Sequence, residues 1–421
     1  MRILIATDSF PPNCGGSGWS TWELARGLRQ RGHAIDVIQP RPGTSGNQSR
    51  EYDGFTIEEF GAAAPPIPFV RNYFKNERLY AALEAHLSAR LARDRPDVVH
   101  AQHVLTAPPA IAAARAANLP VVVTVRDYWP VCYWSTLIVD PATAQLCPAC
   151  STAGMRRCLE GRVGPVWPVA ASMIPYMQAN LARKRSRLTS ADAVIAVSGQ
   201  IGRDLVARAP ELAATRVEVV PNPFDLASLV ETARTMPPPR TPPYALYVGK
   251  LEPNKGADLL PRTAQEAGLT MPLVIVGDGS QRAAIEREAR ELGVELHVTG
   301  WLSRDAALGW MAAAAFLIFP SRGPESLSRV LVEASALGVP TAAMDTGGTR
   351  DIIESDRTGL LSTDASGLSR DVRRLAADQS LRERLGAAAA LHVRERFDAP
   401  RVVARIESIY KELVASPRSR T

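Results

Sequence analysis

Short apolar runs alternate with helical stretches along most of this 421-residue chain. In the first half, runs typical of β-strands occupy residues 3–6, 35–38, 98–100, 121–125, 193–197 and 217–220, and helical patterns between them include 19–30 and 73–93. Strands that are separated by helices form parallel sheets with crossover helices. The sequence therefore predicts an α/β fold built on a parallel sheet.

A proline-rich stretch interrupts this alternation. Residues 235–243 contain five prolines, and proline fixes φ and lacks a backbone donor, so this stretch reads as a linker. Beyond it, strands are expected at 245–248, 273–276, 296–299, 316–319 and 341–343, and helices at 256–268, 281–293 and 305–314. We expect a first Rossmann-like domain over 1–230, a linker over 231–243, a second such domain over 244–395 and a final segment over 396–421. The amphipathic helix in that segment, at 401–415, can pack on either domain.

The composition favours anionic partners. A net charge of +6 suits nucleotide phosphates or a lipid surface, although an arginine-rich proteome gives the same balance. No basic run interleaved with aromatic residues indicates a nucleic-acid groove. The first residues read as a strand that runs into Asp8 without a cleavage site, and no apolar run approaches the ~20 residues of a membrane span. We therefore expect a cytoplasmic protein.

Two lysines follow the first strand after the linker. Gly249 and Lys250 end that strand, and Lys255 and Gly256 precede the next expected helix. An ammonium is a mobile point charge that suits phosphate, so two of them suit a diphosphate. Two exposed loop lysines without a ligand are the alternative interpretation.

The next two strands also end in glycine. Gly277 and Gly279 follow the strand at 273–276, and Gly300 ends the following one. Glycine lets a backbone approach a flat or anionic ligand, although tight turns need glycine in any case. Because parallel strands end at one edge of a sheet, we expect these loops to converge there.

Glu325 and Glu333 stand on either side of a loop-to-helix boundary. The buried strand before them places Glu325 in the loop and Glu333 on a helix expected at 329–337. Ser326 or Ser328 can cap this helix, whose free amide groups suit a phosphate. Two surface glutamates without a ligand are the alternative interpretation.

The first strand of the chain is followed by a glycine-rich loop. Gly15, Gly16 and Gly18 lead directly into a helix whose amide groups can hold an anion. Thr21 stands where a dinucleotide fingerprint needs a third glycine, which argues against an NAD-dependent dehydrogenase.

Two histidines lie near the end of the strand at 98–100. We expect His103 to line a cleft between the two expected domains, where it could contact a sugar or shuttle a proton. For His100, a structural hydrogen-bonded role is equally plausible.

Four cysteines cluster in a loop-like segment. Cys132, Cys147, Cys150 and Cys158 include one Cys-x-x-Cys spacing and suggest a structural tetrahedral zinc site. Reduced cysteines without a metal are the alternative, and disulfides are less common in the cytoplasm. Cys14 stands apart from this cluster.

Taken together, these residues resemble glycosyltransferase family 4, a family of retaining enzymes with the GT-B fold. The resemblance covers nearly the whole chain and rests on Gly15-Gly16, Gly249 to Gly256, Gly277 to Gly279, the Glu325 and Glu333 pair, and Gly338 to Gly348. It implies two Rossmann-like domains facing each other across a cleft, with the acceptor on the first and the donor on the second. Three positions depart from the family pattern: Lys250 replaces an arginine, and Gln102 and Arg126 replace histidines.

The resemblance also implies roles for single residues. Glu333 would hold the ribose of a UDP- or GDP-sugar, and Glu325 would contact the donor sugar near the reacting carbon. The backbone amides of Leu327 and Ser328 would hold the diphosphate together with Lys250 and Lys255, so no catalytic metal is expected.

The expected reaction is retaining transfer of a hexose to a polysaccharide, lipid-linked or small-molecule acceptor. The family resemblance favours front-face attack, in which the leaving phosphate takes the acceptor proton. The alternatives are a GT-B epimerase or phosphorylase and a catalytically silent sugar-nucleotide-binding scaffold. The basic run at 183–187 could touch an anionic lipid surface, although a solvated helix face also explains it.

Overall fold

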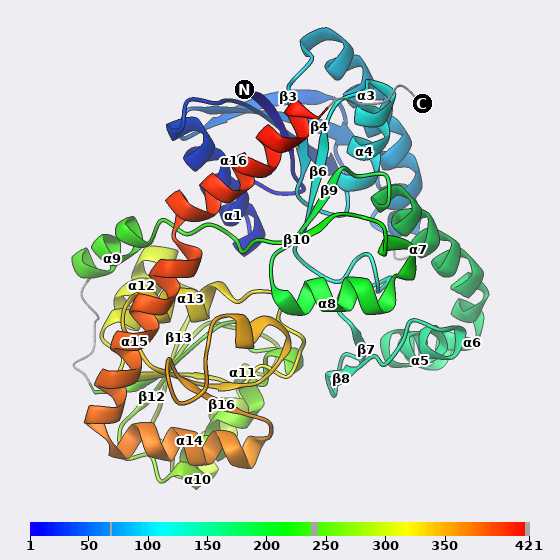
Figure 1. Cartoon of the computed structure of the whole chain (residues 1–421). Coiled ribbons are helices and arrows are strands. Elements are labelled where there is room, and N and C mark those ends of the chain that lie inside the picture. Colours follow the sequence, from blue (N-terminus) through cyan, green and yellow to red (C-terminus); the bar gives the residue numbers. More distant parts are fainter. Residues whose placement is uncertain (68–69, 237–242, 417–421) are drawn as a thin grey trace. The chain divides into compact units, whose positions relative to one another are not determined.

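Figure 1 shows the computed structural model of the chain, which describes residues 1–67, 70–236 and 243–416. Contacts divide the chain into two compact units. Unit 1 comprises Met1–Thr136, Ser172–Phe224 and Ala399–Thr421, and unit 2 comprises Leu137–Ala171 and Asp225–Asp398. Each unit has its own, mainly parallel sheet, which confirms the predicted α/β class with two parallel-sheet bodies.

The sheet of unit 1 contains all six strands that the sequence predicted. Its strands are β1 (Arg2–Ala6), β2 (Ala34–Pro42), β3 (Asn47–Tyr52), β4 (Phe55–Ala62), β5 (Val98–Ala101), β6 (Val121–Val125), β9 (Ala193–Ala196) and β10 (Val217–Val219). Their order is β10-β9-β6-β5-β1-β2-β4-β3, and β3 pairs with β4 in the antiparallel direction while the other pairs are parallel.

Strands β3 and β4 were not predicted, although their turn carries a local signal. Asp53 and Gly54 connect them with φ angles of 51° and 71°. Asp-Gly is a preferred pair for a two-residue hairpin turn in which both residues have positive φ.

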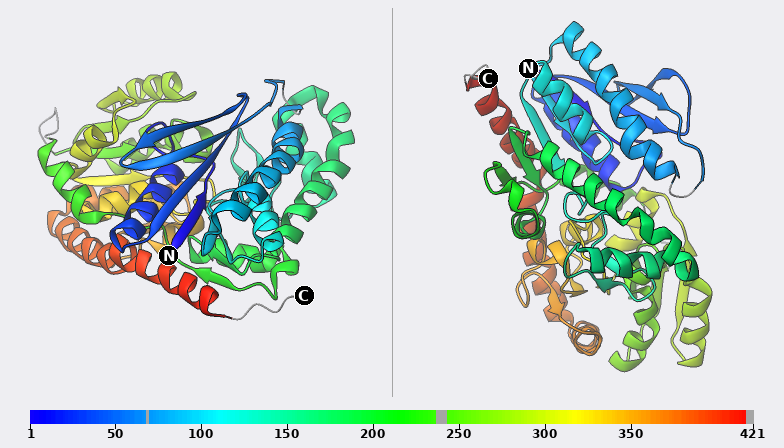
Figure 2. Two further views of the ribbon diagram at one scale, coloured as in Figure 1. Left: turned by 90° about the horizontal axis from the view of Figure 1, so that it is seen from above. Right: turned by 90° about the vertical axis from the view of Figure 1, so that its right-hand side faces the viewer.

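Helices cover both faces of this sheet. They are α1 (Gly16–Gln30), α2 (Val70–Tyr73), α3 (Leu79–Asp94), α4 (Ala107–Ala116), α7 (Ile174–Leu188), α8 (Gly199–Arg208) and α16 (Ala399–Ala415), with a π-helical turn, η1 (Phe74–Arg78), leading into α3. Figure 2 shows α3 and α4 side by side on one face of the sheet, and these two helices pack against each other.

The C-terminal helix α16 belongs to unit 1. It lies beside α1 (Figure 1), and the two helices come so close that a Cβ on Gly27 would lie 2.6 Å from Cγ2 of Val403. Ile406 joins Ile3 and Leu24 in one buried cluster. On the same helix, Oε2 of Glu407 accepts a hydrogen bond of 2.7 Å from Nε of Arg31, so both apolar and ionic contacts hold α16 in place.

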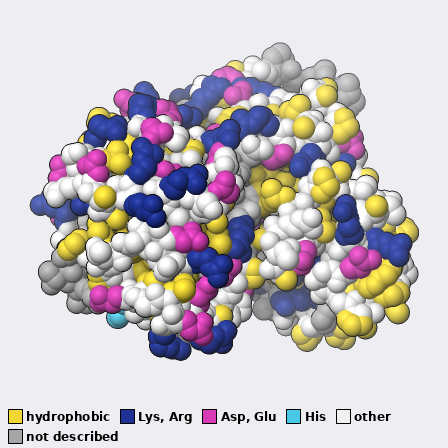
Figure 3. Space-filling view, turned by 90° about the horizontal axis from the view of Figure 1, so that it is seen from below, with side chains coloured by type: hydrophobic (Ala, Val, Ile, Leu, Met, Phe, Trp, Pro, Cys, Tyr) yellow, Lys and Arg dark blue, Asp and Glu magenta, His cyan; other side chains and the backbone are white. Residues whose placement is uncertain are grey.

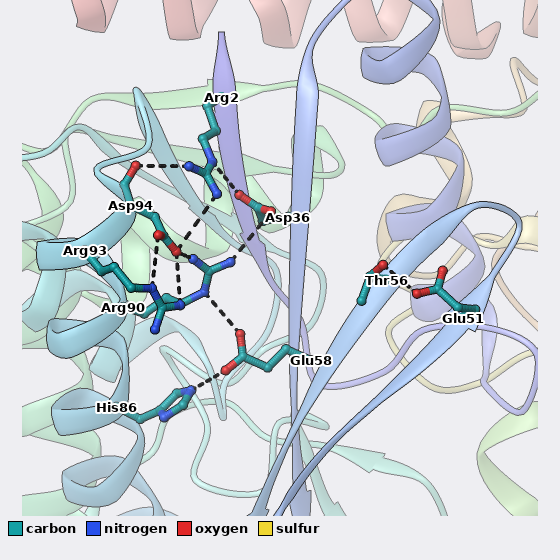
Figure 4. Close-up of polar contacts among 9 residues, drawn as sticks. All are labelled: Arg2, Asp36, Glu51, Thr56, Glu58, His86, Arg90, Arg93 and Asp94. Carbon is teal, nitrogen blue, oxygen red and sulfur yellow. Dashed lines mark hydrogen bonds and ion pairs between the residues drawn. The ribbon is translucent and has the colours of Figure 1, made fainter.

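Charged side chains also tie β2, β4 and α3 together within unit 1. Figure 4 shows Glu58 accepting hydrogen bonds from His86, at 2.6 Å, and from Nε of Arg90, at 3.2 Å. Arg90 also reaches Asp36, and Nε of Arg2 donates to Asp36 at 2.8 Å. The hydrogen bond from His86 is the main cause that lowers the pKa of Glu58.

Unit 2 is built on a second parallel sheet. Its strands are β11 (Ala245–Val248), β12 (Leu273–Val276), β13 (Leu296–Gly300), β14 (Phe316–Phe319), β15 (Thr341–Met344) and β16 (Leu360–Ser362), in the order β13-β12-β11-β14-β15-β16. The helices around it are α9 (Leu226–Thr235), α10 (Leu260–Ala267), α11 (Arg282–Glu291), α12 (Arg304–Ala312), α13 (Arg329–Ala336), α14 (Ala365–Ala377) and α15 (Gln379–Phe397). Strands β12 and β14 are buried along their whole length, which explains why they read as unbroken apolar runs.

Two further segments bear on the sequence predictions. The cysteine-containing segment from residue 137 to 171 groups with unit 2 and holds the hairpin β7 (Ile138–Asp140) and β8 (Gln145–Leu146), followed by α5 (Thr152–Val163) and α6 (Trp167–Ala170). The expected linker over 231–243 overlaps the end of α9, and its residues 237–242 lie outside the described residues. Within the described residues, no helix is both long and apolar enough to cross a membrane.

Candidate functional site

Unit 2 places Lys255 and Glu325 where its strand order reverses. Strand β11 lies between β12 and β14, so the chain builds the sheet outward from β11 in both directions. Open parallel sheets bind ligands at the carboxyl ends of the strands at such a point. Lys255 follows β11, Glu325 follows β14, and Nζ of Lys255 lies 2.6 Å from Oε1 of Glu325.

The neighbouring loops meet at the same edge through their glycines. A Cβ on Gly277, after β12, would lie 1.9 Å from the carbonyl oxygen of Gly249, after β11. Gly277 also forms an isolated bridge with Gly300, at the end of β13. On the other side, a Cβ on Gly347, after β15, would lie 2.1 Å from the carbonyl oxygen of Glu325. Side chains at Gly277 and Gly347 would therefore push these loops apart.

Several contacts fix the position of Glu325. Besides the Lys255 ammonium, the Ser321 hydroxyl donates to Oε1 of Glu325 at 2.6 Å. The backbone N–H of Gly348 donates to the carbonyl oxygen of Glu325 at 2.6 Å. The Glu325 side chain is 12% exposed, so its carboxylate is held at the sheet edge with limited contact to water.

Glu333 lies on α13 and is paired with two arginines that the sequence analysis did not name. Its Oε1 accepts a hydrogen bond of 3.2 Å from Nη2 of Arg304 and lies 3.5 Å from Nη2 of Arg329. Arg329 stands four residues before Glu333 on the same helix, which is a recognisable pairing distance in sequence. Arg304 comes from α12, and no local pattern predicts that contact.

The loop between these glutamates leads into the start of α13. Ser328 occupies the N-cap position of α13, as predicted. Its side chain, however, makes no capping hydrogen bond. Leu327 and Ser328 are buried and Ser326 is partly exposed. Lys250 is exposed, and its carbonyl oxygen accepts the Tyr247 hydroxyl at 2.7 Å.

Unit 1 has a corresponding point at the carboxyl ends of β1 and β5. Strand β1 lies between β5 and β2, and here the chain order reverses as it does at β11 in unit 2. Asp8 follows β1 and His103 follows β5, and the backbone N–H of Asp8 donates to Nδ1 of His103 at 3.3 Å. The predicted position of His103 at a strand end is therefore observed, and Asp8 is a partner that the sequence analysis passed over.

The contacts of His103 decide which ring nitrogen carries its proton. Because Nδ1 accepts the N–H of Asp8, the neutral ring carries its proton on Nε2. His103 is 8% exposed, and its Nε2 has no hydrogen-bond partner among the described residues. Burial, with the nearby charge of Arg126, holds the pKa of His103 well below its usual value. The neutral ring of His103 can therefore donate a hydrogen bond from Nε2, but it has no free nitrogen that could accept a proton, because Nδ1 already accepts the N–H of Asp8.

His100 has a structural environment. Its Nε2 lies 2.7 Å from the Thr124 hydroxyl, its Nδ1 pairs with the hydroxyl of Tyr410 on α16, and its side chain is fully buried. Burial lowers the pKa of His100 to about 3, so the ring stays neutral at physiological pH.

Titratable side chains gather around Asp8. Its carboxylate accepts the N–H of Leu105 at 3.0 Å and the hydroxyl of Thr106 at 3.1 Å, yet burial raises the pKa of Asp8 to about 7. Burial also raises the pKa of Asp127, after β6, to about 6, and lowers the pKa of Lys184 on α7 to about 8. Unit 1 thus holds two carboxyl groups and one ammonium that titrate near neutral pH.

Arg126 and Gln102, at two positions that depart from the pattern of the family that the sequence resembles, contact each other. Arg126 donates to the side-chain carbonyl of Gln102 and, at 2.6 Å, to Oδ1 of Asn222. Arg126 is 7% exposed, and Gln102 is fully buried with no hydrogen-bond partner for Nε2 among the described residues. Arg126 is thus a buried cation close to the carboxyl end of β6.

The predicted zinc site is not formed. In the described part of the chain, no three His, Cys, Asp or Glu side chains are placed to hold a metal ion together. Cys132 belongs to unit 1, whereas Cys147, Cys150 and Cys158 belong to unit 2. Sγ of Cys147 donates to the carbonyl oxygen of Ala149 at 3.2 Å, and such a contact needs the thiol, not the thiolate that zinc binds.

The remaining predicted residues divide between the units. Gly279 lies in the loop after β12, where a Cβ would approach the carbonyl oxygen of Leu251 to 2.5 Å, so it belongs to the converging loops of unit 2. Gly16 begins α1 in unit 1. The structure therefore brings the predicted donor residues together in unit 2, apart from Gly16, which shares unit 1 with His103.

Two family models match this chain. The model described as Glycosyltransferase Family 4 matches residues 14–228, which is about half of the chain, and the model described as Glycosyl transferases group 1 matches residues 231–392. The second match begins just before the proline-rich stretch and includes it, and the two matches together span most of the sequence.

Individual proteins match over nearly the full length. Glycogen synthase of Mycobacterium tuberculosis is 28% identical, with 97% of this chain and 94% of the relative covered. The structure of sucrose-phosphate synthase from Thermosynechococcus elongatus matches with a TM-score of 0.70 at 19% identity, covering 99% and 100% of the two chains. The structure of Anabaena Alr3699/HepE in complex with UDP-glucose matches with a TM-score of 0.62 at 18% identity, covering 98% and 100%. At these identities, the structural matches show a shared GT-B fold.

Proposed function

This chain belongs to glycosyltransferase family 4, and from that membership we propose that it transfers a hexose from a UDP- or GDP-sugar to an acceptor hydroxyl. Enzymes of this family take the sugar from a nucleotide sugar and retain its anomeric configuration. The acceptor that we propose is a polysaccharide, lipid-linked or small-molecule hydroxyl compound of cell-envelope biosynthesis. The UDP-glucose complex of HepE supports a nucleotide hexose as donor.

The observation that carries the proposal is the pairing of Lys255 with Glu325 at 2.6 Å where the strand order of unit 2 reverses. A nucleoside diphosphate that leaves a sugar develops negative charge on its phosphate oxygens. Cations and N–H groups aimed at that charge lower the barrier, because they stabilise the transition state more than the ground state. The ammonium of Lys255 lies beside the carboxylate that we assign to the donor sugar.

We assign the donor contacts as follows. Glu333 holds the ribose hydroxyls, since its carboxylate is buried on α13 and is oriented by Arg304 and Arg329. The amides of Leu327 and Ser328 hold the diphosphate together with Lys250 and Lys255. Glycines line the same edge and let the backbone approach the nucleotide, namely Gly249, Gly277, Gly279 and Gly300. For Gly16, at the start of α1 in unit 1, we propose separately that its amide binds an anion.

For the chemical step, we propose front-face attack of the acceptor hydroxyl on the anomeric carbon. The bond from that carbon to the phosphate oxygen breaks as the bond to the acceptor oxygen forms, and the hydroxyl proton passes to the leaving phosphate. His103 does not take this proton, because its Nε2 already carries one. We propose instead that His103 donates from Nε2 to an oxygen of a sugar bound in unit 1.

Product analysis tests the proposal. The purified protein is incubated with UDP- and GDP-hexoses, with and without candidate acceptors, and the nucleotide and sugar products are identified. Release of nucleoside diphosphate that depends on an acceptor, together with a glycoside of retained configuration, is expected. A converted sugar nucleotide without acceptor would instead indicate an epimerase, and nucleotide binding without any turnover would indicate a scaffold.

We propose that a metal ion is not needed for the donor diphosphate, since Lys250 and Lys255 supply positive charge. Removal of divalent ions with EDTA should therefore leave the transfer rate the same as that of the untreated protein. Loss of activity that Mg²⁺ or Mn²⁺ restores would contradict this assignment.

We also propose a cytoplasmic location with peripheral membrane contact. The arginines of the 183–187 run are offset by acidic residues, since Arg183 pairs with Glu77 and Arg185 with Glu211. Figure 3 shows cationic and anionic side chains intermixed over the face it presents. Apolar contact is the stronger support, because Val166, just before α6, and Val169, within α6, are 61% and 79% exposed. Sedimentation of the V169D variant with anionic vesicles, compared with wild type, tests this contact.

A further inference from the structure

A pocket of about 200 Å³ lies among α3, α4 and α7 in unit 1. Its walls come from η1 and α3 on one side, from the start of α4, and from α7 on the other. This volume is below the roughly 300 Å³ at which drug-sized ligand pockets begin, so it suits a group the size of one sugar ring. We call it the α3–α7 pocket.

Most charges around the α3–α7 pocket are offset by a neighbour. Arg183 pairs with Glu77, and Arg187 lies 3.9 Å from Glu84. Each of these pairs joins α7 to the η1–α3 segment across the pocket. The two pairs hold α7 against η1 and α3, and because each pair combines one positive and one negative side chain, they add no net charge to the pocket.

Two buried polar side chains of α7 line the same pocket without a hydrogen-bond partner. Asn180 is 2% exposed, and its Oδ1 has no hydrogen-bond partner among the described residues. Lys184 is 5% exposed, and in the described part of the chain its Nζ has no hydrogen bond and no carboxylate within ion-pair distance; the charges of Asp127 and Glu77 act on it from further away, and its Nζ lies 5.7 Å from the ring of Tyr133. A buried amide oxygen without a partner is costly, and an ammonium that no hydrogen bond occupies can hold an anion.

The pocket adjoins the strand ends that carry Asp8 and His103. Tyr80, on its wall, donates its hydroxyl to the carbonyl oxygen of Val104 at 2.7 Å. Val104 follows His103, and the next residue, Leu105, donates its N–H to Asp8. The side chain of Tyr80 therefore connects the wall of the pocket to the loop that carries His103.

We propose that the α3–α7 pocket binds the acceptor, and that this acceptor is a sugar carrying one anionic group, a carboxylate or a phosphate. The ammonium of Lys184 donates to the anion, and Oδ1 of Asn180 accepts a hydroxyl of the same molecule. The chemistry of the two side chains requires both features, because an ammonium offers donors alone and an amide oxygen is an acceptor. The inference rests on the proposed function and specifies the substrate class.

Binding to the whole chain, without a nucleotide donor, tests this inference. The ligands are neutral hexoses, hexuronates, hexose phosphates and inorganic phosphate, and calorimetry gives each dissociation constant. At least one sugar anion should bind about tenfold or more tightly than its neutral parent, as one charge-assisted hydrogen bond provides. Inorganic phosphate should bind more weakly than that sugar anion, because it lacks the sugar ring whose hydroxyl reaches Asn180 while the anion contacts Lys184.

Variants identify the two side chains. Lys184→Met should remove the preference for the anion and leave the neutral sugar unaffected, whereas the matched Lys411→Met, at an exposed lysine of α16, should keep the preference. Asn180→Ala provides a second variant and should weaken the binding of every sugar in the panel. Thermal melts of each variant exclude loss of folding as the cause.

Three results would overturn the inference. They are the absence of binding across the panel, equal binding of neutral and anionic sugars, and an anion preference that survives in Lys184→Met. A parallel titration with UDP- and GDP-sugars separates it from the proposed function. If a nucleotide sugar binds and no sugar anion binds, only the assignment of the pocket fails. If a sugar anion binds and no nucleotide sugar binds, the proposed function fails.

Discussion

Lys255 and Glu325 stand 70 positions apart in the chain, and the ammonium of one lies 2.6 Å from a carboxylate oxygen of the other. Because the two loops follow the strands on either side of the reversal in strand order, the fold itself brings these residues together. The pair joins the residue that we assign to the diphosphate with the residue that we assign to the donor sugar.

Lys255→Ala should lower kcat/KM for the donor by roughly 10²- to 10³-fold, because it removes one preorganised donor from the leaving group. Lys255→Arg keeps the positive charge and should lose less. Lys411→Ala, at the exposed lysine of α16, is the matched control and should leave steady-state kinetics unchanged. A Lys255→Ala protein that transfers sugar at the wild-type rate would remove Lys255 from the site.

Glu333→Gln should raise KM for the donor by roughly tenfold with little change in kcat, since a ribose contact acts equally in the ground and transition states. Glu325→Gln should instead lower kcat, since that carboxylate is assigned to the reacting sugar. Initial rates over a range of donor concentrations separate the two effects. An equal loss of kcat in both variants would show that Glu333 does more than bind the nucleotide.

The sequence predicted the convergence of the loops in unit 2, because the signals for it are local. Gly249, Gly277 and Glu325 each follow a buried apolar strand, and the carboxyl ends of parallel strands share one edge. The contact between Arg304 and Glu333 lies 29 positions apart on two different helices, so no periodicity or motif encodes it.

In unit 1, the sequence predicted less of the pocket that we propose for the acceptor. Lys184 and Asn180 lie in a stretch with the pattern of an ordinary amphipathic helix, and their lack of hydrogen-bond partners becomes visible only when α7 is packed in the fold. The cysteine spacing suggested a metal site, but spacing along the chain does not ensure that thiols converge in space, and these do not.

The carboxyl group of Asp8 predicts an unusual pH dependence of stability. Burial raises its pKa from 3.8 to about 7 in the folded protein, so between these values the folded state holds a proton that the unfolded state has lost. Stability from this group therefore falls as pH rises from about 4 to about 7. Relative to Asp8→Asn, the wild type should lose stability over that range and level off above it.

Urea unfolding of both proteins between pH 5 and pH 8 measures this difference. Asp127, whose pKa burial raises to about 6, contributes in the same direction and is present in both proteins. Because the charge of Asp127 also raises the pKa of Asp8, the difference between the proteins reports Asp8 together with this coupling. Parallel stability curves for wild type and Asp8→Asn would show that Asp8 titrates normally.

Glu407 fixes the C-terminal helix to unit 1. Its carboxylate accepts hydrogen bonds from Arg31 at 2.7 Å and pairs with His33 at 3.1 Å, and hydrogen bonds from Lys411, Arg31 and His33 lower its pKa to about 2. Glu407→Gln should destabilise the docking of α16 by roughly 1–3 kcal/mol, because hydrogen bonds to a charged group are lost.

Amide hydrogen exchange within α16 measures this docking, because the helix must detach for its amides to exchange. The matched control is Glu412→Gln, one turn further along the helix at a side chain that is 46% exposed, where the loss should stay within about 1 kcal/mol. Equal exchange rates in the two variants would contradict a special role for Glu407.

The central claim is that the loops after β11 and β14 form a site for a nucleotide sugar, and a thermal-shift screen of UDP- and GDP-sugars tests it most directly. At a concentration 100 times its dissociation constant, the donor should stabilise the wild-type protein by ~2.7 kcal/mol. The same donor should stabilise Lys255→Ala and Glu333→Gln markedly less. If no nucleotide sugar shifts the melting temperature, or if both variants respond as the wild type does, the donor site does not lie there.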